Sequence, residues 1–389
     1  MNGTPGDAFT MEKYREIRQY AIEHCAFYQD YRADDRFPVM NKQDFIRNAD
    51  LIRSDEVFAE PLHTTSTSGS TGTPFTVYQD REKRCRTIAD LKVYGEYADY
   101  PSHEKMLQLR AYGGKTLDRE VDRRENIWRY DITLLNPDTM RDLVQFILDW
   151  QPRIVFGYVS TLEMICKYVL ESGRKYDFKV RSVLVGAEML SDEAADMIRQ
   201  VFNCPVYDRY SNMEMGIYAQ REHGATPFIV NKASYYLEVL RPDCDEPVGE
   251  HEIGRIVFTD LFNHAFPMIR YDTGDLGSYC LVNGEKQLEK VYGRRVDTIF
   301  DVHGQIVDPH IISHGMWGVT GIAQWQFIQQ ARGQYVIRIN ASGDVDEQDL
   351  LSRMKHYLGE EACIALEYVQ DIPVLGSQKR KYILNEMKG

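Results

Sequence analysis

The chain has 389 residues, more than one domain usually contains, so we expect a large core domain followed by a smaller one. Hydrophobic residues make up 43% of the chain and charged residues 27%, which is typical of a globular protein and does not favour a disordered one. The 46 Lys and Arg residues face 59 Asp and Glu residues, and the formal net charge of -13 argues against nucleic acid as a partner.

The sequence also indicates that the chain is neither a membrane protein nor a protein stabilised by disulfides. No stretch approaches the roughly 20 apolar residues of a membrane helix, and the N-terminus lacks the apolar core of a signal peptide. We therefore expect a cytoplasmic protein without a membrane partner. The seven cysteines are far apart and include no CxxC pair, so we expect reduced thiols, mostly in the core. The sequence leaves open whether the chain forms a homodimer.

The first part of the chain has helical periodicity. Tyr14, Ile17 and Ala21 fall on one face of a predicted helix, and Asn41 is predicted to cap a second helix that contains Phe45. These segments predict an N-terminal helical layer.

The middle of the chain alternates helical patterns with short apolar runs. We expect helices at 81–97 and 140–150, strands at 154–157 and 183–186, a helix at 191–202 and a strand at 205–207. Ser191 is the predicted N-cap of the third helix. Continuously apolar strands are usually buried on both faces, so this order predicts an α/β core.

From about residue 229 the pattern changes to antiparallel strands separated by Pro and Gly turns, which adds mixed β elements to the α/β fold. After Gly293 we expect a small, mobile α+β domain with strands at 324–329, 335–339 and 364–369 and a helix at 347–358. The predicted division is an N-terminal domain at 1–293 and a C-terminal domain at 294–389.

The strongest local motif is TSGSTGTP at residues 67–74, in which hydroxyl side chains and glycines alternate. Its residues are Thr67, Ser68, Gly69, Ser70, Thr71 and Gly72, followed by Thr73 and Pro74. Hydroxyl groups and successive backbone N–H groups of this kind suit a polyphosphate, although a flexible Ser/Gly linker has a similar composition. A kinase-type loop needs a lysine after the second glycine, where this chain has Thr73. The cation that neutralises the phosphates must therefore come from another part of the chain.

This loop resembles the phosphate loop of the superfamily of acyl-CoA synthetases, adenylation domains and luciferases. Further motifs follow in the same order as in its phenylacetate-CoA ligase and CapK-like branch. They are GYVSTLE at 157–163, GAEML at 186–190, YDRYSNME at 207–214, RYDTGDLG at 270–277, GRRVDTI at 293–299 and IPVLGSQKRKYI at 372–383. The resemblance spans about residues 64 to 383.

The resemblance implies a role for four charged residues. Glu214 would hold Mg²⁺ on the nucleotide phosphates, a task that suits a carboxylate. Asp275 would accept the ribose hydroxyls from a turn, and Arg294 would contact ribose or phosphate. Lys379 would be the catalytic lysine, unless the run of basic residues around it is only a solvated tail. The ordinary alternatives are an exposed acid for Glu214, a simple turn for Asp275 and a surface arginine for Arg294.

The resemblance also implies contacts around the base and the acyl group. The predicted nucleotide-binding residues are Gly186, Ala187, Glu188, Asp208, Tyr210 and Ser211, and the predicted acyl-pocket residues are Tyr158, Asn212 and Met213. A strand that ends in a turn would also explain the first three, and an ordinary buried aromatic would explain Tyr210. His310 and His314 lack a third ligand, so we expect no metal site there.

Several positions depart from the pattern of these relatives. Ser211 replaces a glycine, Met213 a threonine, Val296 an aspartate, and Gln378 the glycine before the lysine. These departures leave open the alternative that the chain binds a nucleotide but has lost catalytic activity.

The reaction that the resemblance implies is ATP- and Mg²⁺-dependent adenylation of a small-molecule carboxylic acid, with release of pyrophosphate. Acyl transfer would follow, to coenzyme A as in an AMP-forming acid-thiol ligase, or to an acyl carrier protein or an amine. A phosphate-transferring kinase is the further alternative, and it predicts ADP as product.

Overall fold

The computed structural model describes residues 5–32, 35–56, 58–67, 75–112, 116–225, 227–294, 299–307, 312, 315–316, 319–372 and 382–387. The chain forms two compact units, each made of two separate stretches. The first unit contains Met1–Ser102 and Tyr207–Val291, and the second contains His103–Val206 and Tyr292–Gly389. The division at residues 293 and 294 stays a prediction.

The helices of the first unit come from the N-terminal stretch. They are α1 (Pro5–His24), α2 (Lys42–Arg47), α3 (Ala49–Ile52) and α4 (Arg81–Tyr97). The side chain of Asn41 accepts hydrogen bonds from the backbone N–H groups of Gln43 and Asp44, which confirms the predicted cap of α2. Asp80 caps α4 in the same way, through the N–H of Lys83.

The strands of the first unit are antiparallel. They are β1 (His63–Thr67), β2 (Phe75–Gln79), β7 (Val206–Asn212), β8 (Gly216–Glu222), β9 (Ile229–Val230), β10 (Tyr235–Leu240), β11 (Gly254–Asp260), β12 (Tyr271–Val282) and β13 (Glu285–Arg294). β1 pairs with β2, β8 pairs with β7 and β9, and the order of the four-stranded sheet is β10-β11-β12-β13. β12 includes Asp275, so this residue lies within a strand and not on the turn that the sequence suggested.

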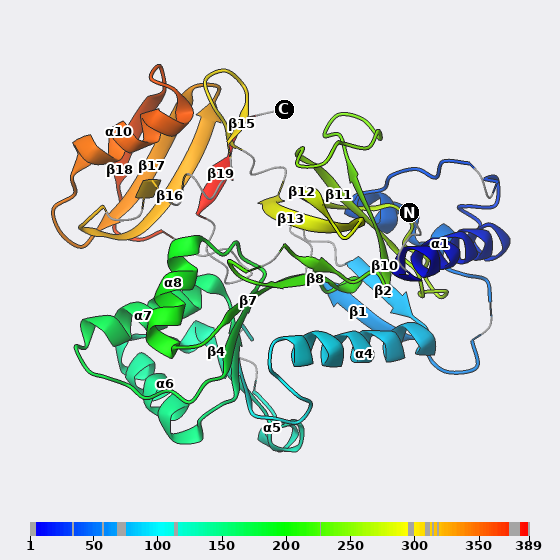
Figure 1. Cartoon of the computed structure of the whole chain (residues 1–389), viewed down its shortest axis with the longest axis horizontal. Helices are drawn as coiled ribbons and strands as arrows, with labels where there is room; N and C mark the ends of the chain where they lie inside the picture. The colour runs from blue at the N-terminus through cyan, green and yellow to red at the C-terminus, as the bar shows by residue number, and fades with distance from the viewer. Residues whose placement is uncertain are drawn as a thin grey trace. The chain divides into compact units, whose positions relative to one another are not determined.

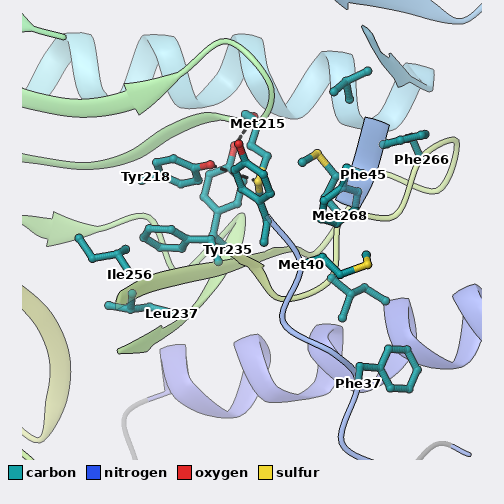
Figure 2. Close-up of a cluster of buried hydrophobic side chains, with 14 of the residues drawn as sticks. Phe37, Met40, Phe45, Met215, Tyr218, Tyr235, Leu237, Ile256, Phe266 and Met268 are labelled. Atoms are coloured by element: carbon teal, nitrogen blue, oxygen red, sulfur yellow. Dashed lines mark hydrogen bonds between the residues drawn. The ribbon is translucent and has the colours of Figure 1, made fainter. Parts of the chain in front are cut away.

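An aromatic core joins these elements of the first unit. Phe45 of α2 packs among Phe75 and Phe266, with ring centroids 6.5 and 6.2 Å away. Figure 2 shows Tyr218 and Tyr235 directed toward Met215, to which the two hydroxyl groups donate hydrogen bonds. The core therefore fixes both α2 and the turn that follows β7.

In the second unit, the stretch from 103 to 206 is an α/β layer. Its strands are β3 (Met106–Arg110), β4 (Ile127–Asp131), β5 (Ile154–Gly157) and β6 (Ser182–Gly186), which are parallel in the order β4-β3-β5-β6. Its helices are α5 (Arg119–Glu125), a short 3₁₀ helix (Ile132–Leu134), α6 (Pro137–Trp150), α7 (Val159–Glu171) and α8 (Asp192–Phe202). Figure 1 shows α6, α7 and α8 beside this sheet. α6 begins earlier than predicted because Asn136 caps it.

The C-terminal stretch of this unit is α+β, as expected. β14 (Ile299–Phe300) pairs with β15 (Ile306–Val307), while β16 (Ile322–Ala331), β17 (Gln334–Ala341), β18 (Cys363–Tyr368) and β19 (Ile383–Asn385) form a sheet in the order β18-β17-β16-β19. Helix α10 (Glu347–Leu358) lies on one face of this sheet (Figure 1), and it buries Leu350, Met354 and Leu358 in the sheet's core.

The predicted α/β class with mixed β elements is confirmed. The prediction that most cysteines lie in the core is wrong, because only Cys25 and Cys166 of the seven are buried, while Cys85, Cys244 and Cys363 are exposed. All seven thiols are unpaired with one another, as the spacing predicted. In the described ranges, no helix has the length and apolar character needed to cross a bilayer.

Candidate active site

Glu214 lies in the tight turn between β7 and β8. The carboxamide oxygen of Asn212 accepts a hydrogen bond of 2.8 Å from the N–H of Met215 and closes this turn. Gly216 has a φ of +124°, and a side chain there would meet the hydroxyl of Tyr235, so glycine suits this position. Within this turn Glu214 is buried, with an exposed fraction of 6%.

The buried carboxylate of Glu214 has a cationic partner. The Nζ atom of Lys42, the first residue of α2, lies 2.9 Å from its Oε1 atom. An ionised carboxylate that is mostly out of water needs such a counter-charge. Lys42 was not among the residues expected from the sequence.

This carboxylate also has the chemistry that a magnesium ion needs. No group of three or more His, Cys, Asp or Glu side chains that could hold a metal occurs within the described ranges. Mg²⁺ is usually held by one or two carboxylates together with substrate phosphates and waters. Glu214 therefore fits a shared site with nucleotide phosphates, and not an all-protein metal cage.

The carboxylate of Asp275, in β12, contacts the hydroxyl group of Tyr210, in β7. The hydroxyl of Tyr210 donates a hydrogen bond of 2.6 Å to Oδ2 of Asp275 and lies 3.0 Å from the hydroxyl oxygen of Thr273. Burial raises the pKa of Tyr210 well above its usual value, and the nearby Asp275 carboxylate raises it further. Tyr210 therefore stays protonated and orients the carboxylate predicted to bind ribose.

Asp208 lies deeper in β7. Its exposed fraction is 8%, and burial raises the pKa of its carboxyl group from 3.8 to about 6, although the nearby Arg221 opposes this shift. The Arg221 guanidinium lies 3.4 Å away, a long contact that offsets only part of the burial cost.

The GAE motif follows β6 in the second unit. Ala187 has a φ of +68°, a left-handed conformation that is strained for a residue with a Cβ atom. The carboxylate of Glu188 accepts hydrogen bonds from the backbone N–H and the hydroxyl of Ser160, at 2.8 and 3.0 Å. Glu188 thus satisfies a donor in the first turn of α7 and fixes the turn after β6.

The residues predicted for the acyl pocket have different surroundings. Tyr158 is the residue before α7 and is 9% exposed, whereas Met213 is 56% exposed on the turn beside Glu214. Asn212 is directed toward backbone N–H groups of its own turn. Ser211 is exposed at an irregularity in the pairing of β7 with β8. Asn212 and Met213 belong to the first unit and Tyr158 to the second.

Other predicted residues lie outside the described part of the structure. They are the phosphate-loop residues Ser68, Gly69, Ser70, Thr71 and Gly72, the catalytic lysine Lys379, and the histidines His310 and His314. The backbone of Thr67 ends β1 and that of Arg294 ends β13, but their side chains are outside the description. Gly186 ends β6 and is buried.

Known proteins resemble this chain in sequence and in fold. Residues 299–386 match the family profile of the CapK C-terminal domain. The chain is 23% identical to protein CapK of Staphylococcus aureus over 377 residues, which cover 91% of this chain and 80% of CapK. It is 26% identical to phenylacetate-coenzyme A ligase of Pseudomonas putida over 215 residues, or 53% of this chain and 46% of that enzyme.

A solved structure has a similar fold over almost the whole chain. It is 2-hydroxyisobutyryl-CoA ligase in the postadenylation state, in complex with R3-HIB-AMP. The TM-score is 0.75 at 17% sequence identity, and the match covers 97% of this chain and 88% of that one. The predicted fold, a large N-terminal core with a small C-terminal domain as in adenylate-forming ligases, is confirmed.

Proposed function

Because the chain is a homologue of CapK and of phenylacetate-coenzyme A ligase, and has the fold of a CoA ligase, we propose that it is an AMP-forming carboxylate ligase. It would use ATP and Mg²⁺ to convert a small carboxylic acid into an acyl-AMP, and would then pass the acyl group to a thiol. The observation that carries this proposal is the contact of Tyr210 with Asp275, because it joins two motifs that are 65 positions apart.

The chain's own residues would bind and orient the two reactants. Asp275, held by Tyr210, would accept the ribose hydroxyls, and Glu214 would face the phosphates. A Mg²⁺ ion bound there would neutralise charge on the phosphate oxygens. Asp208, Tyr210 and Ser211 of the first unit, and Gly186, Ala187 and Glu188 of the second, are further proposed contacts of the nucleotide.

The first step is an in-line substitution at phosphorus. An oxygen of the substrate carboxylate forms a bond to the α-phosphorus of ATP, and the bond from that phosphorus to pyrophosphate breaks. The carboxylate is ionised at neutral pH, so this step needs no general base. The positive charge of Lys379 would stabilise the negative charge that develops on the transferred group.

The second step transfers the acyl group. The acceptor thiol releases its proton to solvent water, and its sulfur forms a bond to the acyl carbon, while the bond from that carbon to the phosphate oxygen of AMP breaks and AMP leaves. We propose coenzyme A as acceptor because phenylacetate-coenzyme A ligase and 2-hydroxyisobutyryl-CoA ligase carry it in their names. The match to CapK is the longer one and its name states no acceptor, so a carrier-protein thiol or an amine is the alternative.

ATP–pyrophosphate exchange tests the first step. The full chain is incubated with labelled pyrophosphate, ATP, Mg²⁺ and a panel of aryl, fatty and amino acids, and AMP release is then measured with and without coenzyme A. We expect exchange with at least one acid, and AMP release that rises with coenzyme A. ATP binding without exchange would indicate a degenerate nucleotide-binding protein, and ADP as the product would indicate a kinase.

A further inference from the structure

We propose that Tyr235 is a positioning residue for Glu214, and that the buried ion pair of Lys83 with Asp260 holds Tyr235 in this role. Tyr235 has no exposed surface, so it acts through the backbone of the turn that carries Glu214 and not by contact with a substrate. The inference rests on the proposed function, in which Glu214 faces the nucleotide phosphates. It adds three residues that lie outside all of the sequence motifs.

The hydroxyl of Tyr235 contacts the turn at the residue that follows Glu214. It donates a hydrogen bond to the backbone carbonyl of Met215 (Figure 2). A Cβ atom at Gly216 would lie 2.9 Å from the same hydroxyl, which therefore packs directly against the backbone of the turn. Tyr235 is the first residue of β10, so this contact ties the turn between β7 and β8 to a different sheet. The position of the Glu214 backbone depends on where this hydroxyl lies.

Lys83 fixes the direction of the hydroxyl proton. The Nζ atom of Lys83 lies 3.0 Å from the hydroxyl oxygen of Tyr235 and 4.7 Å from the centroid of its ring. A lysine ammonium only donates hydrogen bonds, so the tyrosine oxygen accepts from it and directs its own proton to the Met215 carbonyl. Burial raises the pKa of Tyr235 well above its usual value, and the Asp260 carboxylate raises it further, so the hydroxyl keeps that proton.

The ion pair is itself held by three elements of secondary structure. Lys83 lies in the first turn of α4, where its backbone N–H donates a hydrogen bond of 2.8 Å to the cap residue Asp80. Asp260 ends β11 and is paired in register with Tyr235 across the antiparallel ladder. The Nζ atom of Lys83 lies 2.6 Å from Oδ2 of Asp260. Helix α4 and strands β10 and β11 therefore set the place of the ammonium group.

The depth of this ion pair argues for a role beyond stability. Lys83 and Asp260 are both fully buried. Such a pair must offset the lost hydration of two charges, and apolar side chains of similar volume often stabilise a core as well or better. The feature that apolar side chains cannot replace is the hydrogen bond to Tyr235, which extends the pair to the turn. A fully connected polar network of this kind favours one arrangement of its members.

A purely structural role for Tyr235 makes a different prediction. The relevant quantity is the metal-dependent gain, the ratio of the Kd for ATP without Mg²⁺ to the Kd with Mg²⁺. If the Tyr235 hydroxyl only stabilises the core, its loss should lower the melting temperature and leave this gain unchanged. If the hydroxyl positions Glu214, its loss should reduce the gain, and only while Glu214 is present. The Glu214→Gln background separates the two roles.

Isothermal titration calorimetry of the full chain with ATP, in EDTA and in Mg²⁺, provides the test. The variants are Tyr235→Phe, Glu214→Gln, the combination of these two, and Lys83→Met/Asp260→Asn, which removes both buried charges together. Tyr28→Phe is the matched control, because the hydroxyl of this buried tyrosine also donates to a backbone carbonyl in the same unit, at 3.4 Å. Thermal melting checks the fold, and hydrogen exchange of the segment 212–216 reports the order of the turn.

We expect Tyr235→Phe to reduce the metal-dependent gain by about fivefold, the scale of one hydrogen bond, and to speed hydrogen exchange in the turn. The charge variant should reduce the gain as well, because the tyrosine hydroxyl loses its donor. In the Glu214→Gln background, Tyr235→Phe should change the gain by less than about twofold. Tyr28→Phe should keep the wild-type gain and the wild-type exchange in the turn.

The outcomes that would overturn the inference can be told apart. A wild-type gain in Tyr235→Phe, or an equal loss from this substitution with and without Glu214, would reduce Tyr235 to a structural residue while the proposed function stands. A folded charge variant with the wild-type gain would also overturn it, and if that variant does not fold, Tyr235→Phe decides alone. A wild-type chain that binds ATP no better with Mg²⁺ and catalyses no exchange would refute the proposed function, and this inference with it.

Discussion

Replacing Asp275 with alanine separates nucleotide binding from chemistry. If its carboxylate accepts the ribose hydroxyls, the substitution removes a charge-assisted contact that exists both before and during adenylation. Such a contact contributes about 1.5–3 kcal/mol, so the apparent affinity for ATP should fall by roughly 10- to 150-fold. A loss of this kind raises the KM for ATP more than it lowers kcat.

The structure indicates that the fold should tolerate this change. Asp275 is only half-buried, and its partner Tyr210 has a second acceptor, the hydroxyl oxygen of Thr273, at 3.0 Å. The tyrosine proton can turn to that oxygen when the carboxylate is gone. We therefore expect a loss of about 1 kcal/mol in the free energy of unfolding, much smaller than the cost of an orphaned buried donor.

The assay compares ATP with 2′-deoxy-ATP in pyrophosphate exchange. The wild type should prefer ATP, and Asp275→Ala should lose that preference, because the analogue lacks a group that the variant no longer binds. Tyr210→Phe is the matched control, since it removes the orienting hydroxyl but keeps the carboxylate and should retain most of the discrimination. An unchanged preference in Asp275→Ala would show that Asp275 is not the ribose ligand.

Three further predictions concern other residues. Lys379→Ala should lower exchange by about 10²-fold or more while the melting temperature stays close to that of the wild type, and wild-type exchange would refute its assignment. Asp208 keeps a proton up to about pH 6 in the folded state but only to about 3.8 when unfolded, so its contribution to stability should fall as pH rises from about 4 to 6. Urea denaturation of the wild type and of Asp208→Asn measures this effect. Between pH 4 and pH 6 the unfolding free energy of the wild type should fall by about 2–3 kcal/mol relative to that of the variant. A difference that does not change with pH would contradict the shifted pKa. Ala187→Gly should raise the free energy of unfolding by up to about 1 kcal/mol, because Ala187 is exposed and its φ is positive, and a lower stability in denaturant would mean that its Cβ makes contacts that matter.

The sequence by itself determined those elements whose signals are local. Helix α8 begins after Ser191 and ends at Phe202 as predicted, since its cap and its apolar face are both within the segment. The buried strand β5 and the C-terminal helix α10 were predicted with the same bounds that the structure has. Helix α5 was not expected, because its sequence REVDRRE is polar except for Val121 and only the cap by Asp118 marks its start.

The tertiary structure decided which side chains meet. Tyr210 and Asp275 were each predicted from a motif, but their hydrogen bond depends on the packing of β7 against a sheet that begins later in the chain. The partner of Glu214 is 172 positions away, in a short helix that carries no motif. A periodicity or a cap describes one segment at a time, whereas the pairing of buried charges depends on which segments the folded core brings together.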